Sequence, residues 1–257
     1  MDNRKVGLVV ETPLGYFCLM PEDNVGTFVL TKHPNSLIGE VKRAVQAMPR
    51  FGKALVVGAH IGTIAVPLAS HCSELVAIEP NPRSFELLQL NAAMNGRDNM
   101  VLVNVAANDK EEDIEFIVRY DNSGGSGRMP VHKDPEWLGG KHDVIYVAGR
   151  QLDVVLADYT FDLVFMDCEG SEVAAFNGMQ RILADAQSLI VEFMGKHIAR
   201  VAGVTVADFL APLRPHFQRL YIPTTGKWVA PAQFESVLSE MADAGKDDAG
   251  LIFMKGK

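Results

Sequence analysis

Three short segments combine glycines and acids at spacings that suit a nucleotide-like ligand. The first, 57–62, follows an apolar run and is bracketed by Gly58 and Gly62. Glycines there allow a sharp turn and a close approach of backbone to ligand, and a following helix offers free N–H groups to electronegative atoms. The GxxxG spacing lacks the third glycine of the dinucleotide fingerprint, so it is a weak signal by itself.

The second segment centres on Glu79, which lies 21 residues after Gly58 at the end of another apolar run. An acid at this distance from a glycine turn is placed to bind ribose hydroxyls, and a carboxylate can accept both hydrogen bonds of a vicinal diol. A solvated loop acid is the alternative. The pairing with the glycine turn favours ligand binding.

The third segment, 167–172, reads Asp-Cys-Glu-Gly-Ser-Glu and follows a further apolar run. Ligands of open α/β sheets bind beyond the carboxyl ends of the strands, which is where Asp167 is expected. Glu169 and Glu172 are three residues apart and would be neighbours on a helix. Glu172 has an alternative role, because an acid in a first turn stabilises the helix dipole.

The elements that would position these segments alternate along the chain from residue 53. Apolar runs typical of buried strands occur at 54–57, 74–79, 100–107, 161–167 and 188–194. Helical stretches separate them, and one opens with Pro82 and ends near Gly96. We therefore predict an α/β fold with a doubly wound, mostly parallel sheet, closed by antiparallel strands at 217–222 and 251–255.

Two regions depart from this alternation. Residues 1–50 are predicted to form an N-terminal β-hairpin and helix extension of the domain at 51–257, with β-type runs at 6–12, 15–20 and 26–31. A helix is expected over 36–48, capped by Asn35 or Ser36. The stretch 121–150 is glycine-rich and then polar, which predicts a long functional or mobile loop.

The composition of the 257 residues excludes several classes of protein. Hydrophobic residues make up 48% of the chain without a run long enough to cross a bilayer, and no signal peptide is apparent. A net charge of −8 disfavours nucleic acid as a partner. The three scattered cysteines favour a cytoplasmic location, and CxxC and HExxH patterns are missing, so we expect no metal site. The sequence leaves the oligomeric state open.

Four segments in order resemble the successive motifs of FkbM-type methyltransferases. They read VVGAHIG, AIEPNPRSFELLQLNAAMNG, NVAANDKEEDIEF and FMDCEGSEVAAFNGM, and the resemblance spans about 50–195. It implies a Rossmann-like class I methyltransferase sheet that binds S-adenosylmethionine and releases S-adenosylhomocysteine. Family members commonly methylate hydroxyls of sugars or natural products, which implies a sugar or small-molecule acceptor.

The resemblance also implies roles for individual residues. The loop under the methionine part of the cofactor corresponds to Val57, Gly58, Ala59, His60, Ile61 and Gly62. The ribose-binding acid and its neighbours correspond to Glu79, Pro80 and Asn81, and the segment near adenine to Ala106, Ala107 and Asn108. The DxEGxE box corresponds to Asp167 on the cofactor side, and to Glu169, Gly170 and Glu172 near the acceptor.

Three positions depart from the family pattern. Val56 stands where members usually carry an acid that helps position the methionine amino group, and His60 replaces the usual asparagine. Pro67 falls inside the helix expected after the glycine loop, where it would remove an N–H group and kink the helix. These departures imply a weakened or altered cofactor site.

Methyl transfer to a hydroxyl needs in-line positioning and benefits from a general base. The candidates for the base are Asp167, Glu192 and His197, followed by His132 and His142 in the long loop. Aromatic residues that could line an acceptor pocket, or simply pack in the core, are Phe193, Trp137 and Trp228.

Three functions remain open at this point. The first is O-methylation of a sugar or small molecule, and the second is N-methylation of a macromolecule. The second lacks support, because no NPPY-like tetrapeptide follows the fourth strand. The third is cofactor binding without catalysis, which the departures at Val56, His60 and Pro67 would explain.

Overall fold

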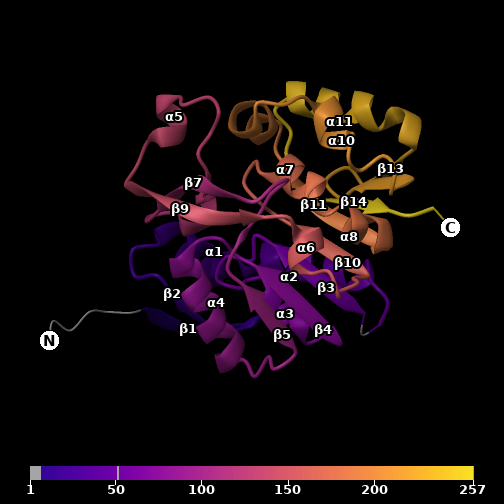
Figure 1. The fold of residues 1–257 in the computed structure, drawn as a ribbon. Helices are drawn as coiled ribbons and strands as arrows, with labels where there is room; N and C mark the ends of the chain where they lie inside the picture. Colours follow the sequence, from indigo (N-terminus) through magenta and orange to yellow (C-terminus); the bar gives the residue numbers. More distant parts are fainter. Residues whose placement is uncertain (1–6, 51, 257) are drawn as a thin grey trace, which may run out of the picture.

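The centre of the structure is an eight-stranded sheet in the order β13-β12-β14-β11-β10-β3-β4-β5 (Figure 1). The computed structural model describes residues 7–50 and 52–256. Five strands are parallel: β3 (Lys53–Val57), β4 (Glu74–Ile78), β5 (Met100–Val103), β10 (Leu163–Met166) and β11 (Ser188–Phe193). Antiparallel strands complete one edge: β12 (Arg219–Ile222), β13 (Lys227–Val229) and β14 (Asp248–Met254). The predicted mostly parallel sheet with antiparallel closing strands is confirmed, and β13 is an addition.

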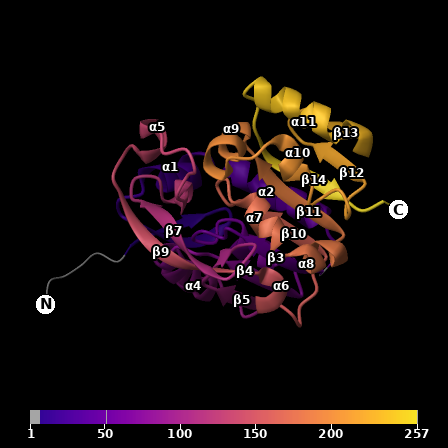
Figure 2. The same cartoon turned by 45° about the horizontal axis from the view of Figure 1, so that its top comes forward.

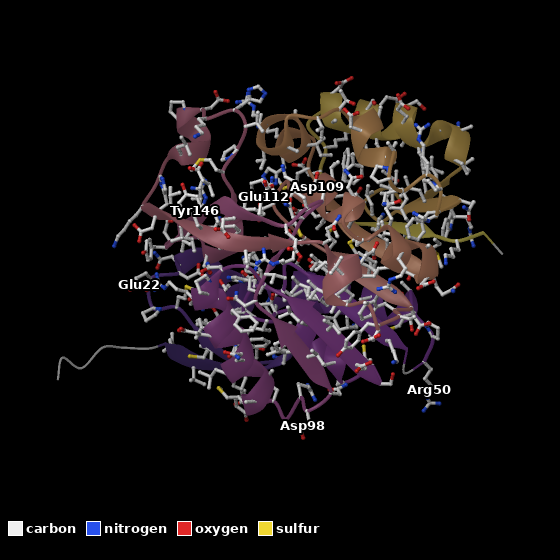
Figure 3. All side chains as sticks on the ribbon, in the orientation of Figure 1. Glu22, Arg50, Asp98, Asp109, Glu112 and Tyr146 are labelled. Carbon is white, nitrogen blue, oxygen red and sulfur yellow. The ribbon has the colours of Figure 1, made fainter. Side chains whose placement is uncertain are left out.

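The strand order reverses between β3 and β10. The strands β4 and β5 follow β3 on one side of it in the sheet, whereas β10 and β11 lie on its other side. Arg50, which precedes β3, and Asp98, which precedes β5, both lie toward the bottom of the view in Figure 3, at the end of the sheet where these parallel strands begin. Ligands of such sheets bind beyond the carboxyl ends of the strands at the point of reversal, and two of the predicted segments follow β3 and β10.

Helices cover both faces of the sheet, as the doubly wound prediction requires (Figure 2). One face packs against α2 (Pro34–Gln46), α3 (Ala65–Ala69) and α4 (Pro82–Met94). The other packs against α6 (Leu152–Val155), α7 (Glu172–Asn177), α8 (Gln180–Asp185), α10 (Val206–Leu210) and α11 (Phe234–Asp243). Successive side chains of a strand alternate between faces, so Val56 packs with the first group and Val57 with the second.

The N-terminal extension matches its prediction only in part. Strands β1 (Leu8–Thr12) and β2 (Gly15–Leu19) form the expected hairpin. The run 26–31 was wrongly predicted as a strand and lies in α1 (Asn24–Lys32), because the Asp23 carboxylate accepts a bond from the Gly26 N–H and caps a helix.

The start of α2 also differs from its prediction. The helix begins at Pro34 after His33 rather than at Asn35 or Ser36, since proline suits the first helical position. Val41 of α2 packs with Val56 of β3 in one hydrophobic core. The division of the chain at residue 50 remains a prediction.

A second, four-stranded sheet is inserted between β5 and β10. Its order is β6 (Ala106–Ala107), β9 (His142–Arg150), β7 (Glu112–Arg119) and β8 (Gly127–Arg128). The prediction of a loop over 121–150 was therefore wrong at its end, because 142–149 pairs antiparallel with β7 and Arg150 pairs in parallel with β6. This sheet buries one face and exposes the other, where Tyr146 projects outward (Figure 3).

Short elements complete the chain. The predicted strand 100–107 is split between β5 and β6, because the Asn104 side chain between them bonds the Glu79 carbonyl oxygen at 2.7 Å. The remaining short helices are η1 (Ser123–Gly125), α5 (Pro135–Leu138), α9 (Gly195–His197), η2 (Ile198–Ala202) and η3 (Pro231–Gln233). Among the helices of the described residues, none is long and apolar enough to cross a membrane.

Candidate active site

The glycine turn after β3 is pressed against the loop after β10. Gly58 has φ +81°, and a Cβ atom added there would lie 1.7 Å from the Asp167 carbonyl oxygen. Only glycine satisfies both the backbone angle and this close approach. His60 also has a positive φ, +51°, which is uncommon for a residue with a side chain. The two predicted segments therefore meet through their backbones.

Glu79 joins the tips of β3 and β4. Its Oε2 accepts a hydrogen bond from the His60 N–H at 2.7 Å, and its Oε1 accepts one from the Asn81 N–H at 2.8 Å. The side chain is buried, which raises the pKa of Glu79 to about 7 even though the two backbone bonds favour its charged form. The glycine turn and the predicted ribose acid are thus adjacent.

A cavity of about 240 Å³, hereafter the first cavity, opens between these loops. It is lined by ten of the predicted cofactor residues: Val57, Gly58, Ala59, His60, Ile61, Glu79, Pro80, Ala106, Ala107 and Asp167. Gly62, Asn81 and Asn108 are not among its lining residues. Asn81 instead caps α4 by accepting a bond from the Arg83 N–H, and Asn108 is buried beneath Arg128, which donates to its Oδ1.

Two walls of the first cavity lie outside the segments predicted to bind the cofactor. The N-terminal extension supplies Gly26, Val29, Leu30, Leu37 and Glu40. The inserted sheet and its loop supply Ile114, Phe116, Asn122, Ser123, Gly124, Ser126 and Arg128. Neither set carries a motif, and only the folded chain brings them to the strand tips.

A chain of hydrogen bonds closes one side of the first cavity. The His60 Nε2 atom lies 2.6 Å from the Ser123 hydroxyl, and that hydroxyl donates to the Asp23 carboxylate. The chain therefore joins the glycine turn, the inserted loop and the start of α1. Burial lowers the pKa of His60 to about 4, so the ring is neutral at pH 7.

A second cavity, of about 490 Å³, adjoins the first. Its polar lining includes Arg119, Asp121, Asn122, Arg128, Glu169 and His197. Asn122, Arg128 and Glu169 line both cavities, so the two spaces meet at these side chains. The second cavity is formed by the inserted sheet on one side and by the segments after β10 and β11 on the other.

The two glutamates of the box after β10 lie in different surroundings. Glu172 turns inward, where its Oε1 accepts bonds from the N–H groups of Cys168 and Gly170, and it lines neither cavity. Burial raises its pKa to about 7. Glu169, with a φ of +53°, reaches the junction of the cavities, and burial raises its pKa well above the ordinary value.

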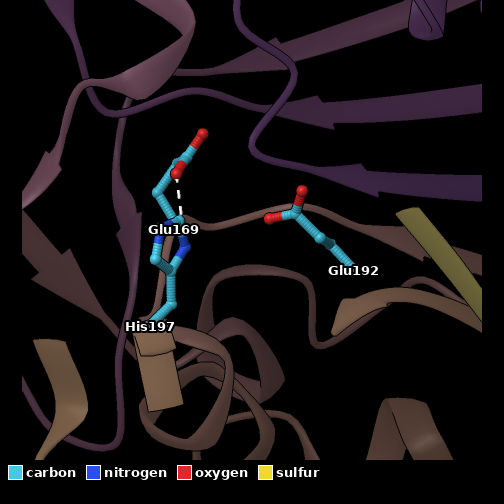
Figure 4. A group of neighbouring side chains, drawn as sticks. All are labelled: Glu169, Glu192 and His197. Carbon is cyan, nitrogen blue, oxygen red and sulfur yellow. Dashed lines mark ion pairs between the residues drawn. The ribbon is translucent and has the colours of Figure 1, made fainter. Parts of the chain in front are cut away.

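Glu169, Glu192 and His197 form a cluster from three separate elements (Figure 4). The Nδ1 atom of His197 lies 3.4 Å from Oε2 of Glu169, and the Glu192 carboxylate points toward this pair. One ligand atom from each residue lies within 4.8 Å of the others, so the cluster could hold a shared proton or a cation. The expected lack of a metal site remains a prediction.

Asp167 and Glu192 add further negative charge beside this cluster. Their side chains share a hydrogen bond, and burial raises the pKa of both, that of Glu192 to about 10. Glu192 lines neither cavity, whereas Asp167 lines the first. Carboxylates held so close together favour either protonation or a cationic ligand.

The remaining candidates lie away from the cavities. His132 and His142 line neither one. Phe193 packs in the core, Trp228 is exposed beneath Arg219 at the sheet edge, and the side chain of Trp137 lies outside the described residues. Pro67 is the third residue of the five-residue α3, and the helical bonding resumes at Leu68, whose N–H donates to the Ile64 carbonyl.

Comparison with known sequences and solved structures finds the following similarities. A sequence model described as the methyltransferase FkbM domain matches residues 57–247. A solved FkbM methyltransferase from Methylobacillus flagellatus is 17% identical, with 89% of this chain and 52% of that chain covered and a TM-score of 0.45. A TehB-like methyltransferase from Corynebacterium glutamicum is 13% identical, with 85% and 88% covered and the same TM-score. No curated protein matches the sequence.

Proposed function

The chain belongs to the FkbM methyltransferase family, and from this premise we propose that it transfers a methyl group from S-adenosylmethionine to a hydroxyl of a sugar or other small molecule. We assign the donor to the first cavity and the acceptor to the second. The observation that carries this proposal is that the cavities meet at Asn122, Arg128 and Glu169. A donor and an acceptor must be held together at such a junction for the transfer.

The residues of the first cavity fit S-adenosylmethionine in their chemistry. Each Glu79 oxygen accepts one backbone bond and keeps a further lone pair, which suits the ribose diol. Ala107 and Phe116 offer apolar surface for the adenine, and Asp167 offers negative charge for a cationic donor. When bound, the donor supplies a methyl group activated by its sulfonium.

We propose that His197 is the general base that accepts the proton of the acceptor hydroxyl. This side chain lines the second cavity, and burial lowers its pKa, so the ring is neutral at pH 7 and can accept a proton. The imidazolium that results would pair with Glu169, 3.4 Å away. Of the other predicted bases, Asp167 and Glu192 share a hydrogen bond, and we assign Asp167, which lines the first cavity, to facing the positive charge of the donor instead.

The lining of the second cavity supports a polar acceptor. Arg119, Asp121 and Asn122 combine donors and acceptors of hydrogen bonds on the wall that faces His197. Such a mixture suits the several hydroxyls of a sugar better than a purely apolar compound. The cytoplasmic location expected from the sparse cysteines is part of the same proposal.

Calorimetry and a transfer assay test the proposal. The purified chain should bind S-adenosylmethionine and S-adenosylhomocysteine, and it should release S-adenosylhomocysteine when supplied with a hydroxyl-bearing sugar from a panel of glycosides. A lack of binding of either compound at millimolar concentration would refute both enzyme functions. Transfer to amine-bearing macromolecules, with none to the glycosides, would favour N-methylation.

A further inference from the structure

Glu40 reaches the first cavity from outside the segment that matches the family. It lies on α2, before residue 57, where the family match begins, and it lines the cavity together with Val56, Gly58 and Asp167. Ala44, one turn further along the helix and so on the same face, packs into the core. The packed side of α2 therefore holds the half-buried Glu40 carboxylate at the cavity edge.

The position of Glu40 complements that of Val56. In β3, Leu55 and Val57 pack on the face away from α2, whereas Val56 packs on the face that α2 covers. A side chain at position 56 therefore points toward the helix that carries Glu40. Val56 is apolar and buried, so this side of the cavity has no acid from β3, and Glu40 supplies one.

Glu40 and Asp167 both line the first cavity. The two carboxylates are close enough for the charge of Asp167 to raise the pKa of Glu40, although burial of Glu40 is the larger cause. Oε1 of Glu40 pairs with the Ser36 hydroxyl at 3.2 Å, and Arg43 partly offsets the charge from one turn further along the helix. The two acids in the lining of the first cavity therefore favour a positively charged group there.

We propose that Glu40 binds the α-ammonium group of the donor's methionine part, and so provides the contact for which position 56 has no acid. This inference rests on the proposed use of S-adenosylmethionine in the first cavity. The α-ammonium is present in both S-adenosylmethionine and S-adenosylhomocysteine, whereas 5′-methylthioadenosine has the same nucleoside without the amino-acid tail. Comparing the binding of S-adenosylhomocysteine with that of 5′-methylthioadenosine therefore distinguishes a contact to the amino-acid tail from a contact to the nucleoside.

Binding of these two ligands to the full chain and to Glu40→Gln tests the proposal. The variant should lose about tenfold or more in affinity for S-adenosylhomocysteine, because the acceptor facing the ammonium group loses its negative charge. Its affinity for 5′-methylthioadenosine should stay within about twofold, since that ligand lacks the group. Glu86→Gln is the matched control, because it removes the same charge from an exposed position on α4 and should change neither affinity.

The outcomes separate this inference from the proposed function. An unchanged affinity of Glu40→Gln for S-adenosylhomocysteine, or an equal loss for both ligands, would overturn the role of Glu40 alone. Failure of the unaltered chain to bind either ligand would overturn both proposals. If Glu40→Gln does not fold, Glu40→Asp gives the same test, because shortening the side chain withdraws the carboxylate without removing its charge.

Discussion

The two cavities of the site are built in different ways. The first lies at the tips of parallel strands, where backbone contacts define one side of it, such as those from the N–H groups of His60 and Asn81 to the Glu79 carboxylate. The second is walled by side chains of the inserted sheet and of the segment after β11, including Arg119 and His197. The comparison indicates that donor binding depends on the fold itself, whereas acceptor choice depends on replaceable side chains.

The largest effect that separates the cavities is expected at His197. His197→Asn should lower kcat by about 10²–10⁴-fold, because the acceptor hydroxyl loses its base, and should leave the affinity for S-adenosylhomocysteine unchanged. Steady-state kinetics and calorimetry measure the two quantities. His132→Asn changes a histidine that lines neither cavity and should keep full activity. Equal kcat values for the two variants would remove His197 from the chemistry.

A pair of glycines tests the claim that backbone contacts define the first cavity. Gly58→Ala should lower the free energy of unfolding by about 1–3 kcal/mol more than Gly96→Ala, since both have positive φ and only Gly58 faces a carbonyl oxygen. Around Gly96 no heavy atom of the described residues lies within 4 Å of an added Cβ atom. Denaturant unfolding of both variants gives the difference. Similar values would mean that the two loops can separate at little cost.

A comparison of Glu79 with Glu172 tests the ribose assignment, because both acids are buried and only Glu79 lines a cavity. Glu79→Ala should weaken S-adenosylhomocysteine binding by about 1–3 kcal/mol through lost bonds to the ribose hydroxyls. Glu172→Ala removes an acid that also accepts two backbone bonds, so it should disturb folding without a comparable loss of affinity. Calorimetry on folded samples measures the affinity of both variants for S-adenosylhomocysteine. Equal losses of affinity in the two variants would contradict the assignment of Glu79 to the ribose.

The smallest expected effect is a dependence of donor binding on pH. Burial raises the pKa of Glu79 to about 7, so below pH 7 its protonated form accepts fewer bonds from ribose hydroxyls. The affinity for S-adenosylhomocysteine should therefore rise as the pH increases from 6 to 8, by up to about tenfold. Glu79→Gln does not titrate there, so its profile should be flatter. Parallel profiles for both proteins would assign the effect to another group.

The fold was largely predictable because its signals are local. The five apolar runs became β3, β4, β5, β10 and β11, since buried parallel strands must be apolar on both faces. The wrong predictions concern a strand with only one face covered by the protein and a segment whose structure depends on a helix cap. The strand 142–150 leaves Val144 and Tyr146 exposed on its uncovered face, and the run 26–31 is helical because Asp23 caps the helix.

The site was predictable only where motifs lie next to strand ends. The glycine turn and Glu79 became neighbours because β3 and β4 pair in parallel, which brings their carboxyl ends to one edge. Glu40 and Ser123 carry no such signal. They line the first cavity because α2 packs over β3 and because the inserted loop folds back onto the glycine turn.

By itself the sequence determined the parallel sheet, the glycine turn and the acids at the strand tips, because hydrophobic patterning and backbone freedom act between near neighbours along the chain. The tertiary structure alone decided which side chains close the first cavity and which form the second. Those contacts join residues far apart in sequence, as between Asp23 and Ser123, which are 100 positions apart. Their geometry depends on how whole elements pack, and no local pattern records that packing.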